Sequence, residues 1–173
     1  MKVYFGIGSN LGDREGNITA AVERIDELIG NVTRKSSLYE TEPWGFQADE
    51  QFLNMALEAE TDLSPADVLE TVQKIEVRLG RIRSDVQYSS RIIDIDILLY
   101  EDVIISQGDL KIPHPLLQER NFVLVPLNEI APDLIHPVYG KTISELLHVC
   151  SDTSEVHTYT GGTVEEARPG EMF

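Results

Sequence analysis

Residues 92–100 constrain the fold more than any other part of the sequence, because this apolar segment is interrupted at two alternating positions, Asp94 and Asp96. Successive side chains of a β-strand point to opposite faces, so the two carboxylates share one face, with Cα atoms roughly 6.5–7 Å apart. The side chains expected to anchor the opposite face in the core are Ile93, Ile95, Ile97 and Leu99. The sequence therefore predicts a half-buried strand that presents a pair of carboxylates.

The remaining periodic segments indicate an α+β fold with a mainly antiparallel sheet. Further strands are expected at residues 2–8, 32–40 and 52–60, and residues 103–105 are expected to return beside residues 92–100. Helices are expected at residues 13–29, 64–79, 116–120, 123–130 and 142–149. The glycine-rich residues 6–12 are interpreted as the tight turn between the first strand and the first helix.

The composition excludes several classes of protein. The 173 residues include 14 Lys and Arg against 30 Asp and Glu, a formal net charge of −16. Such a surface repels nucleic-acid phosphates and anionic lipids, so neither nucleic acid nor a membrane is an expected partner. Apolar runs are too short for a membrane span, and no signal peptide is expected at the start. Cys150 is the only cysteine, which excludes an internal disulfide and a thiolate zinc cluster and favours a cytoplasmic location.

We expect a single domain over residues 1–150, because no linker or internal repeat divides them. Residues 151–173 are polar and acidic with few large apolar side chains, so a loosely attached or disordered tail is expected there. A monomer is the expected state.

The two alternating carboxylates are candidate metal ligands. Adjacent carboxylates repel each other and lose hydration unless a cation lies with them. Mg²⁺ binds through one or two carboxylates and completes its shell with substrate phosphates. On this pattern alone, a solvated sheet face on which Asp94 and Asp96 are merely polar is an equal alternative.

A basic segment lies directly before this pair. Residues 81–91 contain Arg81, Arg83 and Arg91 but only one acidic residue, Asp85. Guanidinium groups bind phosphate oxygens in a bidentate manner, and phosphoryl transfer depends mainly on positioning and charge neutralisation. The segment therefore suits a phosphate-bearing substrate, although ordinary surface arginines on an exposed loop would give the same pattern.

Other candidates are weaker on pattern alone. Phe52 and Asn54 share a strand face and would suit a flat heterocycle, but their spacing favours a structural role. Gln73 and Glu76 are neighbours on a helix and are expected on its solvated surface.

His114 lies between two prolines that fix its placement, and a histidine in such a turn is more often structural. Arg120 and Phe122 follow shortly after it and offer a further cation and a further ring.

Several motifs occur in order along the chain: Gly8-Ser9-Asn10-Leu11-Gly12, Ser37-Leu38-Tyr39-Glu40-Thr41, Phe52-Leu53-Asn54, Arg91-Ile92-Ile93-Asp94-Ile95-Asp96-Ile97-Leu98, Pro113-His114-Pro115, Phe122-Val123-Leu124 and Glu129-Ile130-Ala131-Pro132. Together they resemble the 6-hydroxymethyl-7,8-dihydropterin pyrophosphokinases of folate biosynthesis. The resemblance spans about residues 2–149, and the motif that begins at Arg91 is its most specific part.

The resemblance implies a ferredoxin-like sandwich with helices packed on both faces of the sheet. It also implies transfer of the β,γ-pyrophosphoryl group of ATP to the hydroxymethyl oxygen of the dihydropterin, with release of AMP. Two Mg²⁺ ions on Asp94 and Asp96 would bridge the phosphates of ATP, the co-substrate.

The resemblance also implies site residues. The catalytic residues would be Arg81, Arg91, Asp94 and Asp96. The nucleotide would be bound by Gln73, Glu76, Arg83, Arg91, Ile97, His114 and Arg120. The pterin would be bound by Thr41, Pro43, Trp44, Gly45, Phe52, Asn54 and Phe122, with a phenylalanine on each side of its ring.

The chain departs from the family pattern within residues 81–91. Gln87, Ser89 and Ser90 lie where a basic residue and Gly-Pro are common, Ser84 where a basic residue is common, and Tyr88 where some members have Trp. These departures predict a weaker grip on phosphate and a different loop closure, but not a loss of activity.

Two alternatives belong to other classes of protein. A nucleotidyltransferase also pairs Gly-Ser with an Asp-x-Asp strand, but there the two elements are adjacent, whereas Ser9 and Asp94 are far apart in this sequence. A non-catalytic ferredoxin-like ligand-binding module would not need the carboxylate pair and the arginine segment together.

Overall fold

The computed structural model describes residues 1–42, 51–80 and 92–161, and all elements named below lie in these ranges. The strands are β1 (Lys2–Ser9), β2 (Gly30–Lys35), β3 (Tyr39–Thr41), β4 (Phe52–Thr61), β5 (Asp94–Tyr100), β6 (Ile105–Gln107), β7 (Leu110–Ile112) and β8 (Val156–Thr158). The helices are α1 (Arg14–Leu28), α2 (Pro65–Arg78), α3 (Asn121–Ile130), α4 (Ile143–Val149) and the short 3-10 helix η1 (Leu117–Glu119).

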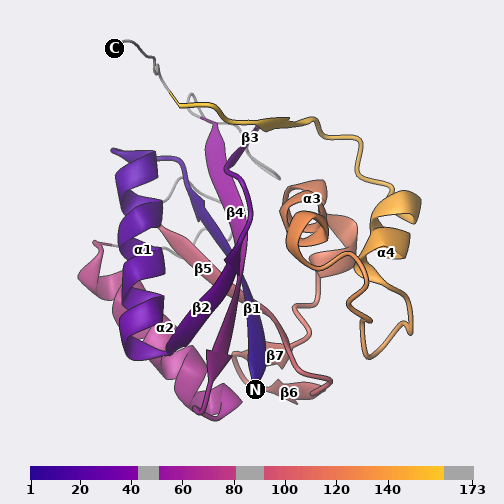
Figure 1. Ribbon diagram of the computed structural model, residues 1–173, viewed down its shortest axis with the longest axis horizontal. Coiled ribbons are helices and arrows are strands. Elements are labelled where there is room, and N and C mark those ends of the chain that lie inside the picture. Colours follow the sequence, from indigo (N-terminus) through magenta and orange to yellow (C-terminus); the bar gives the residue numbers. More distant parts are fainter. Residues whose placement is uncertain (43–50, 81–91, 162–173) are drawn as a thin grey trace.

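Six strands form one sheet in the order β5-β1-β4-β3-β8, and β2 also pairs with β4. The pairings within this sheet are antiparallel. Helices α1 and α2 cover one face, and α3 and α4 cover the other (Figure 1). The chain order contains the βαββαβ arrangement of ferredoxin-like folds. The expected α+β sandwich with helices on both faces is therefore confirmed.

Each face of the sheet has its own apolar core. The side chains of β4 alternate between these two cores. Leu53, Met55 and Leu57 pack with α1 and α2, whereas Ala56 packs with α3 and α4. The prediction that Phe52 and Asn54 share a strand face is confirmed, because both side chains approach the position of a Cβ at Gly8.

The predicted starts of two helices are also confirmed. The Ser64 hydroxyl accepts a hydrogen bond from the backbone N–H of Asp67, and Pro65 opens α2, where its missing N–H has no cost. At α4, Thr142 and Glu145 form a capping box in which each side chain accepts a hydrogen bond from the other's backbone N–H. Local sequence therefore fixes where these helices begin.

The prediction that Leu99 shares a face with Ile95 and Ile97 is wrong. The pairing of β5 with β1 shifts register between Tyr4 and Phe5. A bulge of this kind reverses the alternation of side chains beyond it. Leu99 consequently packs in the core under α3 and α4. Tyr100, the next residue, packs in the core under α1 and α2.

Two other strand predictions are corrected. Residues 103–105 do not return beside β5; instead β6 pairs with β7, with Ile105 opposite Ile112. The strand expected over residues 32–40 is divided into β2 and β3. The backbone N–H of Ser36 donates a hydrogen bond to the carbonyl of Ala56. The return bond is irregular, because the N–H of Ala56 donates to the hydroxyl of Ser36 and not to its carbonyl. A side-chain acceptor at this point interrupts the regular ladder.

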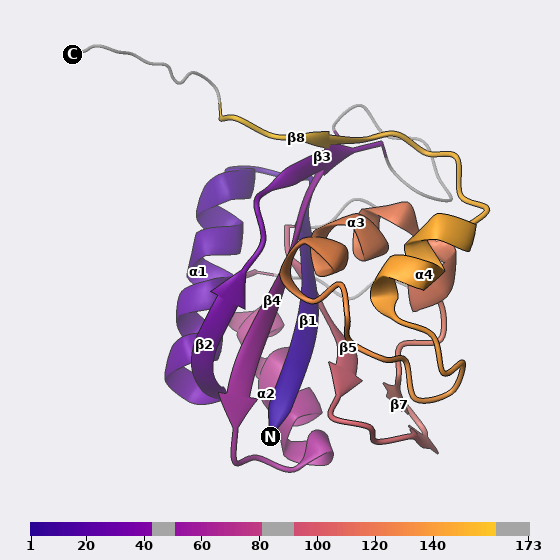
Figure 2. The same ribbon diagram turned by 45° about the vertical axis from the view of Figure 1, so that its right-hand side comes forward.

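The expectation of a loosely attached or disordered tail is wrong for β8. This strand pairs with β3 and forms the edge of the sheet, with Val156 opposite Thr41 (Figure 2). Composition indicated a loose tail because the segment has few apolar side chains, whereas its attachment comes from backbone pairing at an open sheet edge.

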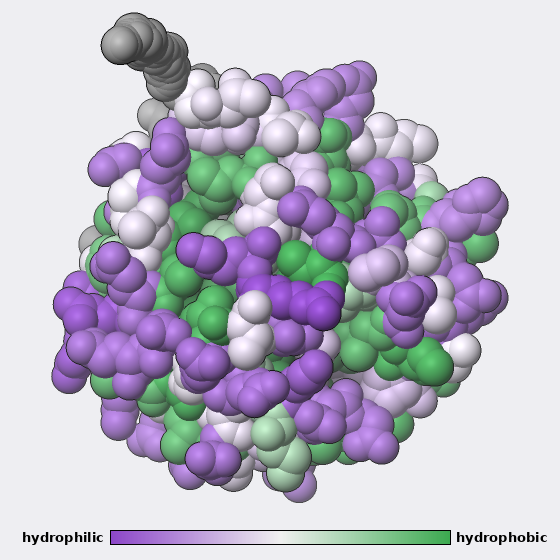
Figure 3. Space-filling model, in the orientation of Figure 1, coloured by the Kyte–Doolittle hydropathy of each residue, from purple (hydrophilic) through white to green (hydrophobic). Residues whose placement is uncertain are grey.

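The surface agrees with the acidic composition. Hydrophilic residues predominate on the face shown in Figure 3, with apolar residues scattered between them. Among the described helices, none combines the length and the apolar character that crossing a bilayer requires.

Candidate active site

Three neighbouring strands bring Asp94, Gly8 and Asn54 into one row across the sheet. Asp94 of β5 lies opposite Gly8 of β1, and Gly8 lies opposite Asn54 of β4. Two strand spacings therefore separate the carboxylate from the amide, about 10 Å between Cα atoms. By alternation, both side chains lie on the face of the sheet that α3 and α4 cover.

Gly8 is buried, and because it has no side chain Asn54 and Phe52 pack close against its strand. A Cβ atom at this position would lie 2.9 Å from Asn54 Oδ1 and 3.6 Å from a ring carbon of Phe52. Any larger residue would therefore displace the amide. Gly6 and Gly8 lie inside β1, as the strand predicted over residues 2–8 requires, and the turn predicted before the first helix contains Gly12, which has a φ of +69°.

The carboxylate pair is accessible. Asp94 and Asp96 are both partly exposed, while Ile95 between them is buried in the core on the opposite face. Two oxygen donors side by side on an open surface fit a hard divalent cation. No group of three or more His, Cys, Asp or Glu suited to a metal occurs within the described residues. Phosphate or water oxygens would complete the coordination of such a cation.

His114 lies beside this pair as a neutral donor. Its Nε2 is 3.9 Å from Asp96 Oδ2, and its Nδ1 accepts a 3.1 Å hydrogen bond from the backbone N–H of Leu116. The ring proton is therefore on Nε2. Burial and the charge of Arg120 lower the pKa of His114 to about 4, although the charge of Asp94 acts in the opposite direction. At neutral pH the imidazole offers an N–H without a positive charge.

Glu76 is buried, contrary to the expectation of a solvated surface. Its side chain is on α2, the residue is 3% exposed, and its carboxylate accepts a 2.8 Å hydrogen bond from the backbone N–H of Ile95. Since β5 is at the edge of the sheet, a side chain can supply the acceptor that a further strand would otherwise provide. Glu76 thus holds the backbone between Asp94 and Asp96. Gln73, three residues earlier, is half-buried.

A pocket of about 210 Å³ opens beside the carboxylate pair. Its lining includes Asp96 and two predicted nucleotide residues, Ile97 and His114. It also includes Leu69 of α2 and Lys111 of β7, which no sequence motif indicated. Neither belongs to a recognisable pattern, because the pocket forms only when β7 folds against β5 and α2.

The described pterin candidates come from three elements. Asn54, 6% exposed, donates a 2.7 Å hydrogen bond from Nδ2 to the hydroxyl of Thr41 on β3. Phe52 begins β4 and lies next to Gly8. Phe122 is in the first turn of α3, where the guanidinium carbon of Arg120 is 5.4 Å from its ring centre, within the range of a cation–π contact. Whether the two phenylalanines enclose one ring stays a prediction.

Six predicted site residues lie outside the described residues, and so do the departures within residues 81–91. They are Pro43, Trp44, Gly45, Arg81, Arg83 and Arg91. Their roles stay predictions.

A ferredoxin-like sheet with a partly exposed carboxylate pair, a pocket beside it and a row of amide and aromatic side chains fits the class of the transferases. The particular family follows from comparison. The chain belongs to the 7,8-dihydro-6-hydroxymethylpterin-pyrophosphokinase (HPPK) family, whose family model matches residues 4–132. The resemblance found in the motifs is thereby confirmed.

Individual relatives agree with this assignment. The 2-amino-4-hydroxy-6-hydroxymethyldihydropteridine pyrophosphokinase of Aquifex aeolicus is 43% identical over 143 residues, covering 83% of this chain and 88% of that protein. The protein of the same name from Bacillus subtilis is 46% identical over 128 residues, covering 73% of this chain and 76% of that protein.

A solved structure is also similar. Plasmodium falciparum HPPK-DHPS matches with a TM-score of 0.67 at 17% identity, covering 85% of this chain and 44% of that chain. At that identity the likeness shows the fold alone, and this chain spans less than half the length of that protein.

Proposed function

We propose that this chain transfers the β,γ-pyrophosphoryl group of ATP to the hydroxymethyl oxygen of 6-hydroxymethyl-7,8-dihydropterin and releases AMP. The observation that supports this most is the row formed by Asp94, Gly8 and Asn54. A phosphate-binding end and a heterocycle-binding end lie about two strand spacings apart on one face, with a glycine, which has no side chain, between them. That separation suits an alcohol on a bicyclic ring approaching a bound triphosphate.

Asp94 and Asp96 are proposed to hold two Mg²⁺ ions together with the phosphates of ATP. When bound, Mg²⁺ would neutralise phosphate charge and orient the reacting group. Glu76 keeps both aspartates in place through the backbone of Ile95. The partial exposure of the pair and its position beside a pocket support this assignment.

The pocket beside Asp96 is proposed to hold the base and sugar of ATP. Ile97 offers an apolar wall, and the Nε2–H of His114 points toward the carboxylate side, where it can donate to a phosphate oxygen. Gln73 and Glu76 on α2 and the buried guanidinium of Arg120 are proposed to complete the nucleotide site.

The pterin is proposed to lie over Gly8. Asn54 and Thr41 would bind its polar edge, Phe52 and Phe122 would stack on its faces, and Pro43, Trp44 and Gly45 would add contacts. The amide of Asn54 is buried and already oriented, so binding would cost little side-chain entropy.

In the proposed reaction, the hydroxymethyl oxygen forms a bond to the β-phosphorus. The bond from that phosphorus to the oxygen bridging to the α-phosphate breaks, so AMP leaves and the hydroxyl proton passes to solvent. Arg81, Arg83 and Arg91 would stabilise the phosphate charge as it moves. No residue is assigned as a general base.

The test is incubation of the protein with ATP, Mg²⁺ and 6-hydroxymethyl-7,8-dihydropterin, followed by separation of the nucleotides. AMP should form in equal amount with the pyrophosphorylated pterin, and omission of the pterin should stop it. The Asp96→Ala variant, which loses a metal ligand, should be inactive while still folded by circular dichroism. Formation of ADP, or AMP release without pterin, would contradict the proposal.

A further inference from the structure

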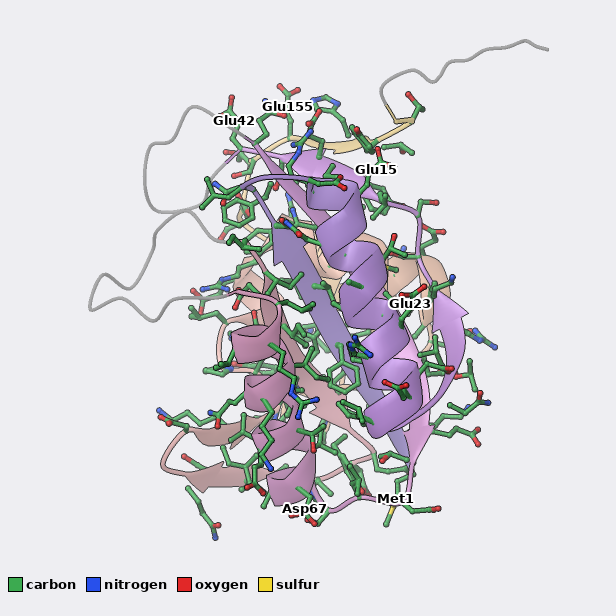
Figure 4. The ribbon with its side chains drawn as sticks, turned by 90° about the vertical axis from the view of Figure 1, so that its left-hand side faces the viewer. Met1, Glu15, Glu23, Glu42, Asp67 and Glu155 are labelled. Carbon is green, nitrogen blue, oxygen red and sulfur yellow. The ribbon has the colours of Figure 1, made fainter. Side chains whose placement is uncertain are left out.

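The segment after α4 crosses from one side of the proposed pterin site to the other. We call residues 151–161 the C-terminal strap. It leaves α4, passes the start of α3 and then runs along β3 as β8 (Figure 2). Figure 4 shows Glu155 of the strap at the same end of the molecule as Glu15 of α1. The strap therefore connects elements that are distant in sequence.

At its first end, the strap caps helix α3. The residue at the N-cap position, Arg120, makes no side-chain capping hydrogen bond. Instead, Asp152 Oδ2 accepts a 2.9 Å hydrogen bond from the backbone N–H of Asn121, the first residue of the helix. The side chain of Asn121 donates in return to the backbone carbonyl of Asp152 at 2.6 Å. A carboxylate at this position satisfies an orphan helix N–H and complements the helix dipole.

Asp152 is itself held in place. Its other oxygen accepts a 2.9 Å hydrogen bond from the backbone N–H of Ser154. Burial would raise the pKa of Asp152, but the hydrogen bonds from Ser154 and Asn121 outweigh it and lower the pKa, so the group is charged at neutral pH. The cap therefore acts as a fixed anion.

At its second end, the strap is attached to β3 and α1. Tyr159 donates its backbone N–H to the carbonyl of Leu38 at 2.8 Å, and its hydroxyl donates to Glu15 at 2.9 Å. The guanidinium carbon of Arg14 lies 5.5 Å from the tyrosine ring centre. The same arginine donates to Glu40 of β3 at 2.8 Å. Aromatic, ionic and backbone contacts thus hold this end.

Each end of the strap adjoins a pterin candidate. Asn121, which Asp152 caps, is followed directly by Phe122. Val156 pairs with Thr41, whose hydroxyl accepts the hydrogen bond of Asn54. β3 is only three residues long, so β8 supplies its second flanking strand. Loss of either attachment would loosen one wall of the site.

We propose that the C-terminal strap is a positioning element for the pterin site, in which Asp152 sets the start of α3 at Phe122 and β8 with Tyr159 sets β3 at Thr41. The inference rests on the proposed function, because that function makes these residues the pterin site. It extends the binding assembly beyond residues 2–149, which contain the motifs that resemble the family. None of the proposed substrate-binding residues belongs to the strap, so its proposed effect passes through the residues that it holds.

The first test compares Asp152→Ala, Asp152→Asn and the control Asp133→Ala, an exposed aspartate outside the strap. Affinities for 6-hydroxymethylpterin and for a non-hydrolysable ATP analogue are measured separately by calorimetry. Asp152→Ala should weaken pterin binding about fivefold, the size of effect expected for a lost helix cap, and change nucleotide binding less than twofold. Asp152→Asn keeps one acceptor oxygen, so its affinity for the pterin should lie between those of wild type and Asp152→Ala. The affinity of Asp133→Ala should equal that of wild type.

The second test concerns the other end of the strap. Tyr159→Ala should weaken pterin binding and speed hydrogen exchange at the backbone amides of β3. Tyr139→Ala, which removes an exposed tyrosine elsewhere, should change neither. Because both readouts are local, they distinguish positioning from a general loss of stability.

The outcomes separate this inference from the proposed function. If wild type neither binds pterin nor releases AMP, the proposed function fails. If wild type is active but Asp152→Ala and Tyr159→Ala bind pterin as wild type does, the strap inference alone is overturned. Equal weakening of pterin and nucleotide binding in Asp152→Ala would also overturn it, because that result indicates only a less stable fold.

Discussion

The side-chain nitrogen of Asn54 donates a 2.7 Å hydrogen bond to the hydroxyl of Thr41 on the adjacent strand. This bond assigns the two ends of the amide, because the nitrogen faces β3 and Oδ1 lies near the position where a Cβ of Gly8 would be. An oriented carbonyl oxygen is a suitable acceptor for a ring N–H of a flat ligand. In the proposed pterin site, Thr41 would therefore determine which edge of the heterocycle Asn54 binds.

Thr41→Val should weaken pterin binding by about five- to tenfold, because the isosteric valine removes the acceptor and leaves the buried amide of Asn54 free to turn. Thr41→Ser keeps a hydroxyl and should bind nearly as wild type does. Calorimetry with 6-hydroxymethylpterin measures both variants, and nucleotide affinity should stay constant. Equal affinity of the valine and serine variants would show that the bond has no role in binding.

Gly8→Ala should reduce pterin affinity strongly while leaving the protein folded. The added methyl group would lie 2.9 Å from Asn54 Oδ1, a side-chain atom that can move, so the amide shifts and the backbone keeps its place. Gly6→Ala is the matched control, since its Cβ would meet only Leu98 at 3.5 Å, an ordinary contact. Thermal unfolding checks that each variant is folded, and calorimetry measures its affinity for 6-hydroxymethylpterin. A larger affinity loss at Gly6 than at Gly8 would contradict the assignment of Gly8 to the pterin site.

Glu76→Leu should lower kcat and stability together. The leucine keeps the volume of the side chain but leaves the N–H of Ile95 without this acceptor, a loss of about 1–3 kcal/mol for a buried donor. Glu76→Gln retains an acceptor oxygen and should keep most of the stability. Urea unfolding and initial rates separate the two variants. Should Glu76→Gln lose as much stability as Glu76→Leu, the charge of Glu76 rather than its acceptor would matter.

The sequence predicted the carboxylate pair well and the surroundings of that pair poorly. Period-2 alternation within residues 92–97 is a local property, so the common face of Asp94 and Asp96 could be derived without knowing any neighbour. The row that joins Asp94 to Asn54 through Gly8 depends on strand register, which is set by the packing of the whole sheet.

The same distinction explains the errors. Helical spacing located Glu76 on α2 but could not show that the edge strand β5 turns an N–H toward it. The bulge that redirects Leu99 and the open edge that receives β8 likewise arise from pairing between distant segments. The functional interpretation of Phe52, Asn54 and His114 came from family resemblance, because their spacing alone favoured structural roles.

A buried carboxylate away from the proposed site makes stability depend on pH. Glu58 on β4 is 4% exposed and accepts hydrogen bonds from the hydroxyls of Tyr4 at 2.6 Å and Thr33 at 2.7 Å. Burial would raise the pKa of Glu58, but these bonds and the charges of Lys2 and Arg34 outweigh it and lower the pKa below its usual value of 4.5. The charged form is therefore the one that the fold stabilises.

A group whose pKa is lower in the folded than in the unfolded chain stabilises the fold fully above the unfolded value, and that contribution disappears as the pH falls through the folded value. Wild type should therefore lose more stability than Glu58→Gln as the pH falls from 7 to below 4.5, because glutamine does not titrate. Tyr4→Phe should cost about 1.5–3 kcal/mol at pH 7, the value of a hydrogen bond to a charged group, and less at low pH. Urea unfolding of the three proteins across this range measures the differences. Parallel pH profiles for wild type and Glu58→Gln would show that Glu58 is not protonated in the range where the fold weakens.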